Sequence, residues 1–171
     1  MLKKDNLLIV GAGGYGRLAK EIAEQTGAFG TIAFLDDNSN QAIGKIDEMV
    51  RFVSEYEYAF VAIGNPKCRR ELLSRLKTCG YKIAILIHPQ AYVSPSAKLG
   101  DGCSVEPFAV VHTGAIVEEG CYICAGAIVN HDANIGVCCH VDCNATVSAR
   151  ACVPCETKVE YGTVFKNKVH E

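Results

Sequence analysis

The second half of the chain repeats a large aliphatic or aromatic residue at every sixth position. The series runs without a gap through Val93, Leu99, Val105, Val111, Val117, Ile123, Val129, Ile135, Val141, Val147, Val153, Val159 and Phe165. Neither the 3.6-residue period of a helix nor the two-residue period of a strand produces this spacing. A sustained six-residue repeat is typical of a β-helix, so we predict a solenoid in which three hexapeptides form each 18-residue coil.

A small residue lies four positions after each of the first twelve members of this series. These positions hold Ala97, Cys103, Ala109, Ala115, Cys121, Ala127, Ala133, Cys139, Ala145, Ala151, Thr157 and Thr163. We expect the large residues to fill a narrow interior and the small ones to lie near its crowded corners. Successive coils would then stack through backbone hydrogen bonds about 4.8 Å apart.

Residues 1 to 88 show a different pattern, in which apolar runs alternate with segments of helical spacing. Four runs predict strands: "NLLIV", "TIAFLDD", "YAFVAIGN" and "YKIAILIHP". The first helix is predicted from Leu18, Ala19, Ile22 and Ala23, and the second from "RRELLSRLKTCG", which ends at Gly80. Alternating strands and helices indicate a parallel sheet. We therefore predict an α/β domain at residues 1–88 and a solenoid domain at residues 89–171.

A glycine-rich turn follows the first predicted strand and opens the first predicted helix. Its spacing, Gly11-x-Gly13-x-x-Gly16, is the dinucleotide-binding fingerprint in its usual context. A dehydrogenase is nevertheless disfavoured. Only about 75 residues separate the fingerprint from the hexapeptide series, which is barely half of a doubly wound domain.

Composition narrows the choice of partner and compartment. The net charge is −2 and no basic patch is evident, so binding to nucleic acid is not expected. The sequence shows neither a signal peptide nor an apolar run of the roughly 20 residues that span a bilayer, so we expect a cytoplasmic protein. In that compartment the ten cysteines would be reduced thiols.

The cysteines raise the alternative of a metal site. Cys121-x-x-Cys124 and Cys152-x-x-Cys155 have the spacing of zinc ligands. The six-residue period weakens this interpretation, because it places Cys121 in a small-residue position and predicts that Cys121 and Cys124 point in different directions. There a thiol acts as a compact hydrophobic group. We therefore expect no metal.

The combination of segments resembles the sugar acetyltransferases of the NeuD/PglD type over nearly the whole chain. The segments that carry the resemblance are "IVGAGGYGR", "FLDD", "VAIGN" followed by Arg69, "LIHPQAYVSPSAKLGDG" and "AIVNHDANIGVCCHV". The resemblance implies a half-Rossmann domain followed by a left-handed parallel β-helix. It also implies acetyl-CoA as co-substrate, and a homotrimer with its active sites between subunits. The implied acceptor is a UDP-linked amino sugar or, alternatively, a sialic-acid-type sugar.

The resemblance also implies which residues bind the nucleotide sugar. The glycine turn would approach the diphosphate, because glycines allow close backbone contact and the start of a helix favours negative charge. Two aspartates would lie near the ribose or uracil, and the end of the third strand would complete the pocket. The implied residues are Gly11, Gly13, Gly14, Tyr15, Gly16, Asp36, Asp37, Gly64, Asn65 and Arg69. Tyr15 stands where many relatives have histidine, so the substrate can differ.

For the chemistry, the resemblance implies His131 as general base, with Asp132 to hold and polarise it. Acetyl transfer needs a base for the acceptor proton and a donor for the oxyanion. Relatives often have glutamate at position 132, which leaves the geometry of the shorter aspartate open. His140 would contact the thioester of acetyl-CoA, and the backbone amide of Ala149 would bind the oxyanion. The period puts His131 and His140 on different faces of the solenoid, so they could meet only across a subunit boundary.

Three further interpretations stay open. His112, Asn130 and Ser148 are spaced by one coil and should form a column that lines the sugar site or is purely structural. Lys158, Lys166 and Lys168 could contact the phosphates of CoA or form a charged end of the solenoid. The solenoid itself could be non-catalytic, or a zinc enzyme of the γ-carbonic anhydrase kind. The zinc alternative fits poorly, because the spacing of His112, His131 and His140 does not match its three ligands.

Overall fold

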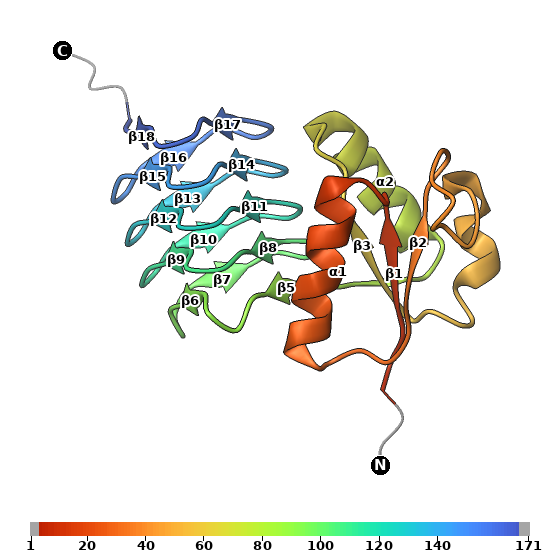
Figure 1. Cartoon of the computed structure of the whole chain (residues 1–171). Helices are drawn as coiled ribbons and strands as arrows, with labels where there is room; N and C mark the ends of the chain where they lie inside the picture. The colour runs from red at the N-terminus through yellow and green to blue at the C-terminus, as the bar shows by residue number, and fades with distance from the viewer. Residues whose placement is uncertain (1–3, 168–171) are drawn as a thin grey trace. The chain divides into compact units, whose positions relative to one another are not determined.

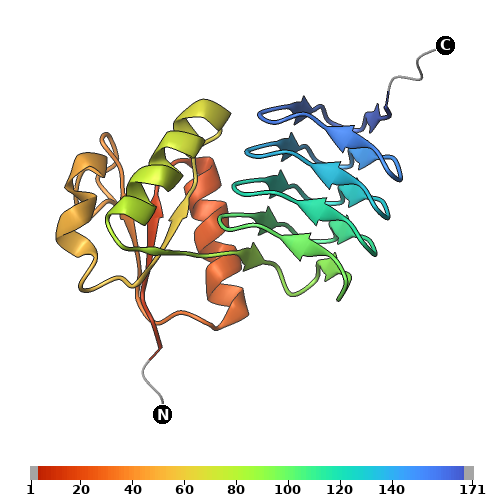
Figure 2. The ribbon, with the colours of Figure 1, turned by 180° about the vertical axis from the view of Figure 1, so that it is seen from behind.

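The computed structural model describes residues 4–167 and divides the chain into two compact units between residues 86 and 87 (Figures 1 and 2). The first unit is an α/β domain, and the second is a solenoid of stacked coils. No helix within residues 4–167 has the length and hydropathy that crossing a membrane requires.

The first unit is built on a parallel sheet with the strand order β2-β1-β3-β4. Its strands are β1 (Leu7–Val10), β2 (Ile32–Leu35), β3 (Tyr58–Val61) and β4 (Lys82–Ile83), and its helices are α1 (Gly14–Thr26) and α2 (Pro66–Thr78). The central strand β1 is completely buried, which explains its unbroken apolar sequence. Helix α2 begins where its sequence favours a start: Pro66 occupies its first turn, and the Asn65 side chain accepts a hydrogen bond from Cys68 N at 3.0 Å.

The predicted parallel sheet is confirmed, but two details of the first unit were not foreseen. The segment "YKIAILIHP" does not form one strand. It divides into β4, which pairs with β3, and β5 (Leu86–Ile87), which joins a sheet of the solenoid. The reason lies in the hexapeptide register, which already includes Ile87, six residues before Val93. The second addition is η1 (Ile46–Phe52), a 3₁₀ helix between β2 and β3.

The solenoid has three faces, each a parallel sheet of two-residue strands. Face 1 comprises β5, β8 (Ser104–Val105), β11 (Tyr122–Ile123), β14 (His140–Val141) and β17 (Lys158–Val159). Face 2 comprises β6 (Tyr92–Val93), β9 (Val110–Val111), β12 (Ile128–Val129), β15 (Thr146–Val147) and β18 (Val164–Phe165). Face 3 comprises β7 (Lys98–Leu99), β10 (Ile116–Val117), β13 (Asn134–Ile135) and β16 (Cys152–Val153).

The register between coils is 18 residues at every step, as predicted. For example, Tyr122 pairs with His140, and His140 pairs with Lys158. The large residues of the six-residue series form one continuous core with the small residues, and those of the middle coils are completely buried. Cys121 Sγ lies 3.0 Å from the carbonyl of Gly136, whereas Cys124 Sγ lies 3.0 Å from His140 Nε2. The two thiols therefore point in different directions, as the period predicted.

The corners between faces use a left-handed backbone conformation. At the corner between faces 2 and 3, three successive coils place Gly114, Asp132 and Arg150 at φ values of 69°, 59° and 59°. Side chains with a Cβ are strained in this region, at a cost of roughly 1–2 kcal/mol, and glycine is not. At each of these corner positions, glycine is therefore free of backbone strain, whereas any other residue lowers the stability.

Replacing Arg150 should reveal this strain. We expect Arg150→Gly to be more stable than Arg150→Ala by about 1 kcal/mol, or about 2–4 °C in the midpoint of thermal unfolding. Both variants lose the same long side chain, so the comparison isolates the backbone. At a position with an ordinary negative φ, the glycine variant would instead be less stable than the alanine variant. A higher midpoint for Arg150→Ala would contradict the strain.

Candidate functional site

The glycine turn at the start of α1 has the geometry of a close backbone approach. Gly11 has a φ of 103°, and a Cβ at Gly11 or Gly16 would collide with neighbouring backbone carbonyls. Gly13 and Gly14, in contrast, are exposed, and a Cβ on either would meet nothing closer than 3.9 Å. The turn thus packs tightly on its inner side and is open on its outer side, where the first amides of α1 favour an anion. Tyr15 is half-buried beside it.

Of the two predicted aspartates, Asp36 lies at the glycine turn. Its carboxylate accepts hydrogen bonds from Ala12 N at 2.8 Å and from Asn38 N and Ser39 N at 2.8 and 2.9 Å. The bond from Ala12, followed by the bond from Asn38, lowers the pKa of Asp36. Asp36 therefore ties the end of β1 to the end of β2 and shapes the turn.

Asp37 points to a different segment. Its carboxylate accepts from Ile46 N at 3.1 Å, and its carbonyl accepts from Lys45 Nζ. It therefore braces the start of η1.

Arg69 lies beneath the loop that follows β3. Its side chain is completely buried, and the guanidinium donates to the carbonyls of Ile63 and Gly64 at 2.8 and 3.0 Å. Arg69 thus holds this loop from inside, and Gly64 and Asn65 are exposed. The interior can retain the guanidinium because its donors are met by backbone carbonyls. The contact of Arg69 with the nucleotide sugar stays a prediction.

The expected catalytic pair lies at the corner between faces 2 and 3. His131 Nδ1 is 3.0 Å from Asp132 Oδ2, and both side chains are about half exposed, at 53% and 55%. An ionised carboxylate only accepts, so Nδ1 carries the proton and Nε2 is left as the basic nitrogen. Gly114 lies directly beneath, where a Cβ would collide with the Asp132 carboxylate. The shorter aspartate therefore does reach the imidazole.

Ala149 lies one coil beyond His131 in the same corner. The register of β12 with β15 and the bond from Arg150 N to the His131 carbonyl, at 3.1 Å, fix this stacking. Within residues 4–167, the amide of Ala149 donates to no backbone carbonyl. Its N–H is thus an available donor in the corner that holds His131 and Asp132.

His140 lies on face 1, away from this corner. Its Nε2 is 3.1 Å from Asp142 Oδ1 and 3.0 Å from Cys124 Sγ, and the ring of Tyr122 meets it edge-on at 5.6 Å between centroids. The structure therefore brings His131, Asp132 and Ala149 together and places His140 on another face of the same chain, as the period predicted.

The remaining predicted groups are distributed as follows. His112, Asn130 and Ser148 form the expected column, because β9, β12 and β15 are in register, and Asn130 donates to the carbonyl of Val147 at 3.0 Å. Lys158 is engaged by Asp142 and Glu160, each at 3.0 Å, which raises its pKa. It is therefore not an unpaired cation for phosphate. Lys166 is exposed, and Lys168 lies outside the described residues.

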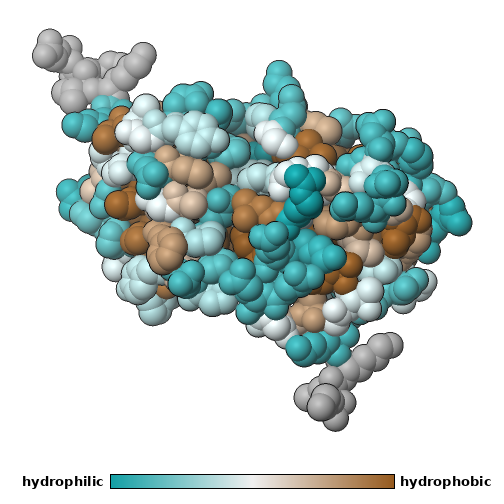
Figure 3. Space-filling view, in the orientation of Figure 1, coloured by the Kyte–Doolittle hydropathy of each residue, from teal (hydrophilic) through white to brown (hydrophobic). Residues whose placement is uncertain are grey.

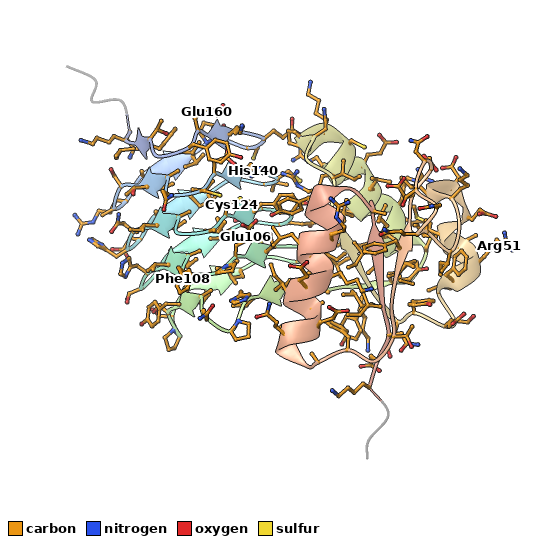
Figure 4. All side chains as sticks on the ribbon, viewed as in Figure 1. Arg51, Glu106, Phe108, Cys124, His140 and Glu160 are labelled. Carbon is orange, nitrogen blue, oxygen red and sulfur yellow. The ribbon has the colours of Figure 1, made fainter. Side chains whose placement is uncertain are left out.

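Sequence reasoning missed a buried polar column on face 1, formed by Glu106, Cys124 and Asp142; Glu106 and Cys124 are labelled in Figure 4. The sequence contained a signal for this column, because the three residues follow one another at intervals of 18 residues, the length of one coil. Donor atoms of Cys124, His140 and Asp142 lie within 4.8 Å of one another, close enough to share an ion. This set contains one histidine and not three, and the ammonium of Lys158 already lies on the second oxygen of Asp142.

Comparison with known proteins identifies relatives that share the first unit and a structure that matches both units. The family described as the PglD N-terminal domain matches residues 6–76. The structure of the acetyltransferase domain of PglB from Neisseria gonorrhoeae, in complex with acetyl coenzyme A, is 32% identical with a TM-score of 0.89, and the match covers 94% of this chain and 82% of that chain. This similarity confirms the predicted fold, a half-Rossmann unit followed by a left-handed parallel β-helix.

Two further relatives are more distant or match in part. UDP-N-acetylbacillosamine N-acetyltransferase from Bacillus subtilis is 31% identical over 107 residues, which are 57% of this chain and 49% of that protein. The match therefore spans about half the length of that relative. Perosamine N-acetyltransferase from Caulobacter crescentus, solved with CoA and GDP-perosamine, is 24% identical with a TM-score of 0.57 over 93% of this chain and 90% of that chain. At that identity it supports the fold alone.

The bracing role of Asp36 predicts a pH-dependent contribution to stability. A carboxyl group with a lowered folded pKa stabilises the protein above its unfolded pKa, and this contribution is lost as the pH falls through the folded pKa. We expect Asp36→Asn to lower the thermal midpoint at pH 7, with the deficit shrinking towards pH 3. Asp37→Asn is the matched control. A deficit for Asp36→Asn that stays constant with pH would contradict the assignment.

Proposed function

Because the chain belongs to the NeuD/PglD-type family of sugar acetyltransferases, we propose that it transfers an acetyl group from acetyl-CoA to a nucleotide-linked amino sugar. The observation that carries this proposal is the exposed His131–Asp132 pair on a solenoid whose fold matches an acetyltransferase domain bound to acetyl-CoA. The acceptor is most consistent with a UDP-linked amino-deoxy sugar, since a relative that shares both a sequence match and this chemistry acts on a UDP sugar.

In the proposed reaction, His131 acts as the general base. Its Nε2 accepts the proton of the attacking amine, while Asp132 holds the Nδ1 proton and stabilises the imidazolium. The amine nitrogen forms a bond to the thioester carbon, and the carbon–sulfur bond breaks to release CoA. The amide of Ala149 is the proposed donor to the oxyanion. No metal is needed for these steps.

The first unit is the proposed holder of the nucleotide. The open outer side of the turn at Gly13 and Gly14 suits a diphosphate, and the exposed loop at Gly64 and Asn65 is the proposed second wall. Tyr15, half-buried in the turn, is proposed to contact the sugar. Asp36 and Asp37 shape the surrounding backbone, so their proposed contribution to binding the ribose or uracil is secondary.

We also propose a homotrimer, supported by the outward side chains of face 2. These are Tyr92, Val110, Ile128, Thr146 and Val164, an almost wholly apolar column in which Tyr92 and Val164 are more than half exposed. Figure 3 shows hydrophobic surface on the side of the solenoid that carries β9, β12 and β15. Burying such a face between copies is favourable. If face 2 lines a three-fold axis, the corner with His131 adjoins the neighbour's corner between faces 1 and 2, beside His140.

Release of CoA tests the function directly. We expect the purified protein to release the CoA thiol from acetyl-CoA with a UDP-4-amino-deoxy sugar as acceptor, and not with sialic acid. Release with sialic acid alone would favour O-acetylation. Release with neither acceptor, together with UDP binding in a thermal-shift assay, would favour a non-catalytic binding module. Stoichiometric zinc in the purified protein would favour the metal-dependent alternative.

Replacing the proposed base should lower turnover strongly and leave the oligomeric state unchanged. We expect His131→Ala to lower kcat by about 10²–10⁴-fold, the usual contribution of a general base. Its size by light scattering should stay that of the wild type, because the side chain is exposed. Thr113→Ala, one coil below His131, is the control. Near-normal turnover in His131→Ala would refute the assigned base.

The glycine beneath Asp132 offers a second test with a closely matched control. Gly114 and Gly126 both have a φ of 69°, and a Cβ on either would collide with the side chain one coil above, Asp132 or Asn144. Gly114→Ala and Gly126→Ala should therefore lose similar stability in thermal unfolding. Gly114→Ala should also lose most of its turnover, because it displaces the carboxylate that holds His131. Undiminished turnover in Gly114→Ala would show that Asp132 does not matter.

A further inference from the structure

Face 1 carries a polar column that the proposed reaction leaves without a role. Glu106, Cys124 and Asp142 directly follow β8, β11 and β14, and their exposed fractions are 4%, 3% and 2%. The backbone bonds from Cys124 N to Val141 O and from Asp142 N to Val159 O, each 2.9 Å, keep successive coils in register. Figure 4 shows Glu106, Cys124, His140 and Glu160 following one another along this side of the solenoid.

The contacts within the column indicate which nitrogen of His140 carries a proton. Asp142 Oδ1 is 3.1 Å from His140 Nε2, and Asp142 Oδ2 is 3.0 Å from Lys158 Nζ. An ionised carboxylate only accepts hydrogen bonds, so Nε2 of His140 carries a proton. His140 thus donates to this buried carboxylate, and Lys158 forms an ion pair with its other oxygen.

Cys124 contributes no charge to this cluster. Burial raises the pKa of its thiol, and the carboxylate of Glu106 raises it further. The thiol therefore remains protonated, and its sulfur lies 3.0 Å from His140 Nε2 as a weak acceptor. Glu106 is in turn fixed by Ala125 N, which donates to its Oε2 at 3.0 Å.

The charge of the His140 ring is set by the groups that face it. Among the described residues these are Asp142 and Cys143 after β14, Lys158 and Tyr161 from β17 and the loop after it, Tyr122 and Cys124 from β11 and the residue after it, and Glu106 through Cys124. Burial raises the pKa of Cys143, and the charge of Asp142 raises the pKa of Tyr161, so both groups stay uncharged. The carboxylate of Asp142 is 2% exposed and lies 3.1 Å from Nε2, which favours the imidazolium, whereas Lys158 is 48% exposed and its opposing charge is screened by solvent and by Glu160.

We propose that Asp142, braced by Lys158, is a positioning residue that holds His140 with Nε2–H on its carboxylate and keeps the ring positively charged. This inference rests on the proposed function and on the contact of His140 with the thioester of acetyl-CoA that the family resemblance implies. There the charge stabilises the anionic oxygen and the departing CoA thiolate as the carbon–sulfur bond breaks. The proton of the attacking amine still goes to His131, so His131 acts as the base and His140 stabilises the developing negative charge.

The electrostatic part can be tested on the intact protein without substrates. Nitrogen-15 NMR of labelled histidine reports the protonated ring nitrogen and the titration midpoint, and His140→Gln identifies the signal. Asp142→Asn should lower the midpoint of His140 by about one to three pH units, because it removes the neighbouring negative charge. Lys158→Met should raise the midpoint, because it removes a neighbouring positive charge. Glu118→Gln and Lys98→Met, at the same repeat positions on face 3, should change neither.

The opposite signs separate a charge effect from a loss of folding. A merely structural Asp142 would lower the thermal midpoint and leave the His140 titration in place, which would overturn the proposal. Since Lys158 is half exposed, Lys158→Met should fold even if Asp142→Asn does not, and an unchanged or lowered midpoint in that variant would overturn the proposal as well. Zinc bound by the wild type and lost in Cys124→Ser would also overturn it, because the metal would then balance the charges.

The catalytic part is tested by the pH profile of kcat. For Asp142→Asn we expect kcat at pH 8 to fall about 10–100-fold with little change in the KM for acetyl-CoA, and the alkaline limb to move to lower pH. The alkaline limb of Lys158→Met should move to higher pH. Opposite NMR shifts without any CoA release by the wild type would contradict the proposed function alone. Opposite NMR shifts with an unmoved alkaline limb would contradict the catalytic role of the charge.

Discussion

The structure of the second unit depends on one constraint, the backbone hydrogen bonding of each coil to the coil 18 residues further on. This register turns sequence spacing into position: residues one coil apart stack, and residues half a coil apart lie on different faces. The interior is then too narrow for anything but alternating large and small side chains. Chemistry is consequently confined to the outward side chains and the corners, where His131 and His140 are found.

The corners add a second restriction that bears on the chemistry. Asp132 lies in the left-handed region and reaches His131 because the residue beneath it is Gly114. The proposed catalytic pair is therefore a property of two coils, although its two residues are adjacent in sequence. His140 is similarly defined by three coils, through Cys124, Asp142 and Lys158. In a solenoid, the position and the contacts of each outward side chain therefore depend on the residues about 18 positions before and after it.

The first unit shows how polar residues that are expected to bind a ligand can also support the backbone. Asp36 satisfies three amides around the glycine turn, and Arg69 satisfies two carbonyls beneath the opposite loop. The family resemblance implied ligand contact for both. Their hydrogen-bond partners are backbone groups that the sequence does not reveal, because a buried N–H or C=O must be paired wherever the fold leaves it.

The sequence by itself determined the solenoid, its 18-residue register, the inward residues, the parallel sheet and the glycine turn, because each follows from local periodicity or from a fixed spacing. It also placed His131 and His140 on different faces by arithmetic alone. Only the tertiary structure decided that Arg69 is interior, that β5 leaves the first sheet, and that Asp142 joins His140 to Lys158. These outcomes depend on which side chains and backbone groups meet across coils and strands, and such meetings are fixed by packing and hydrogen bonding in three dimensions.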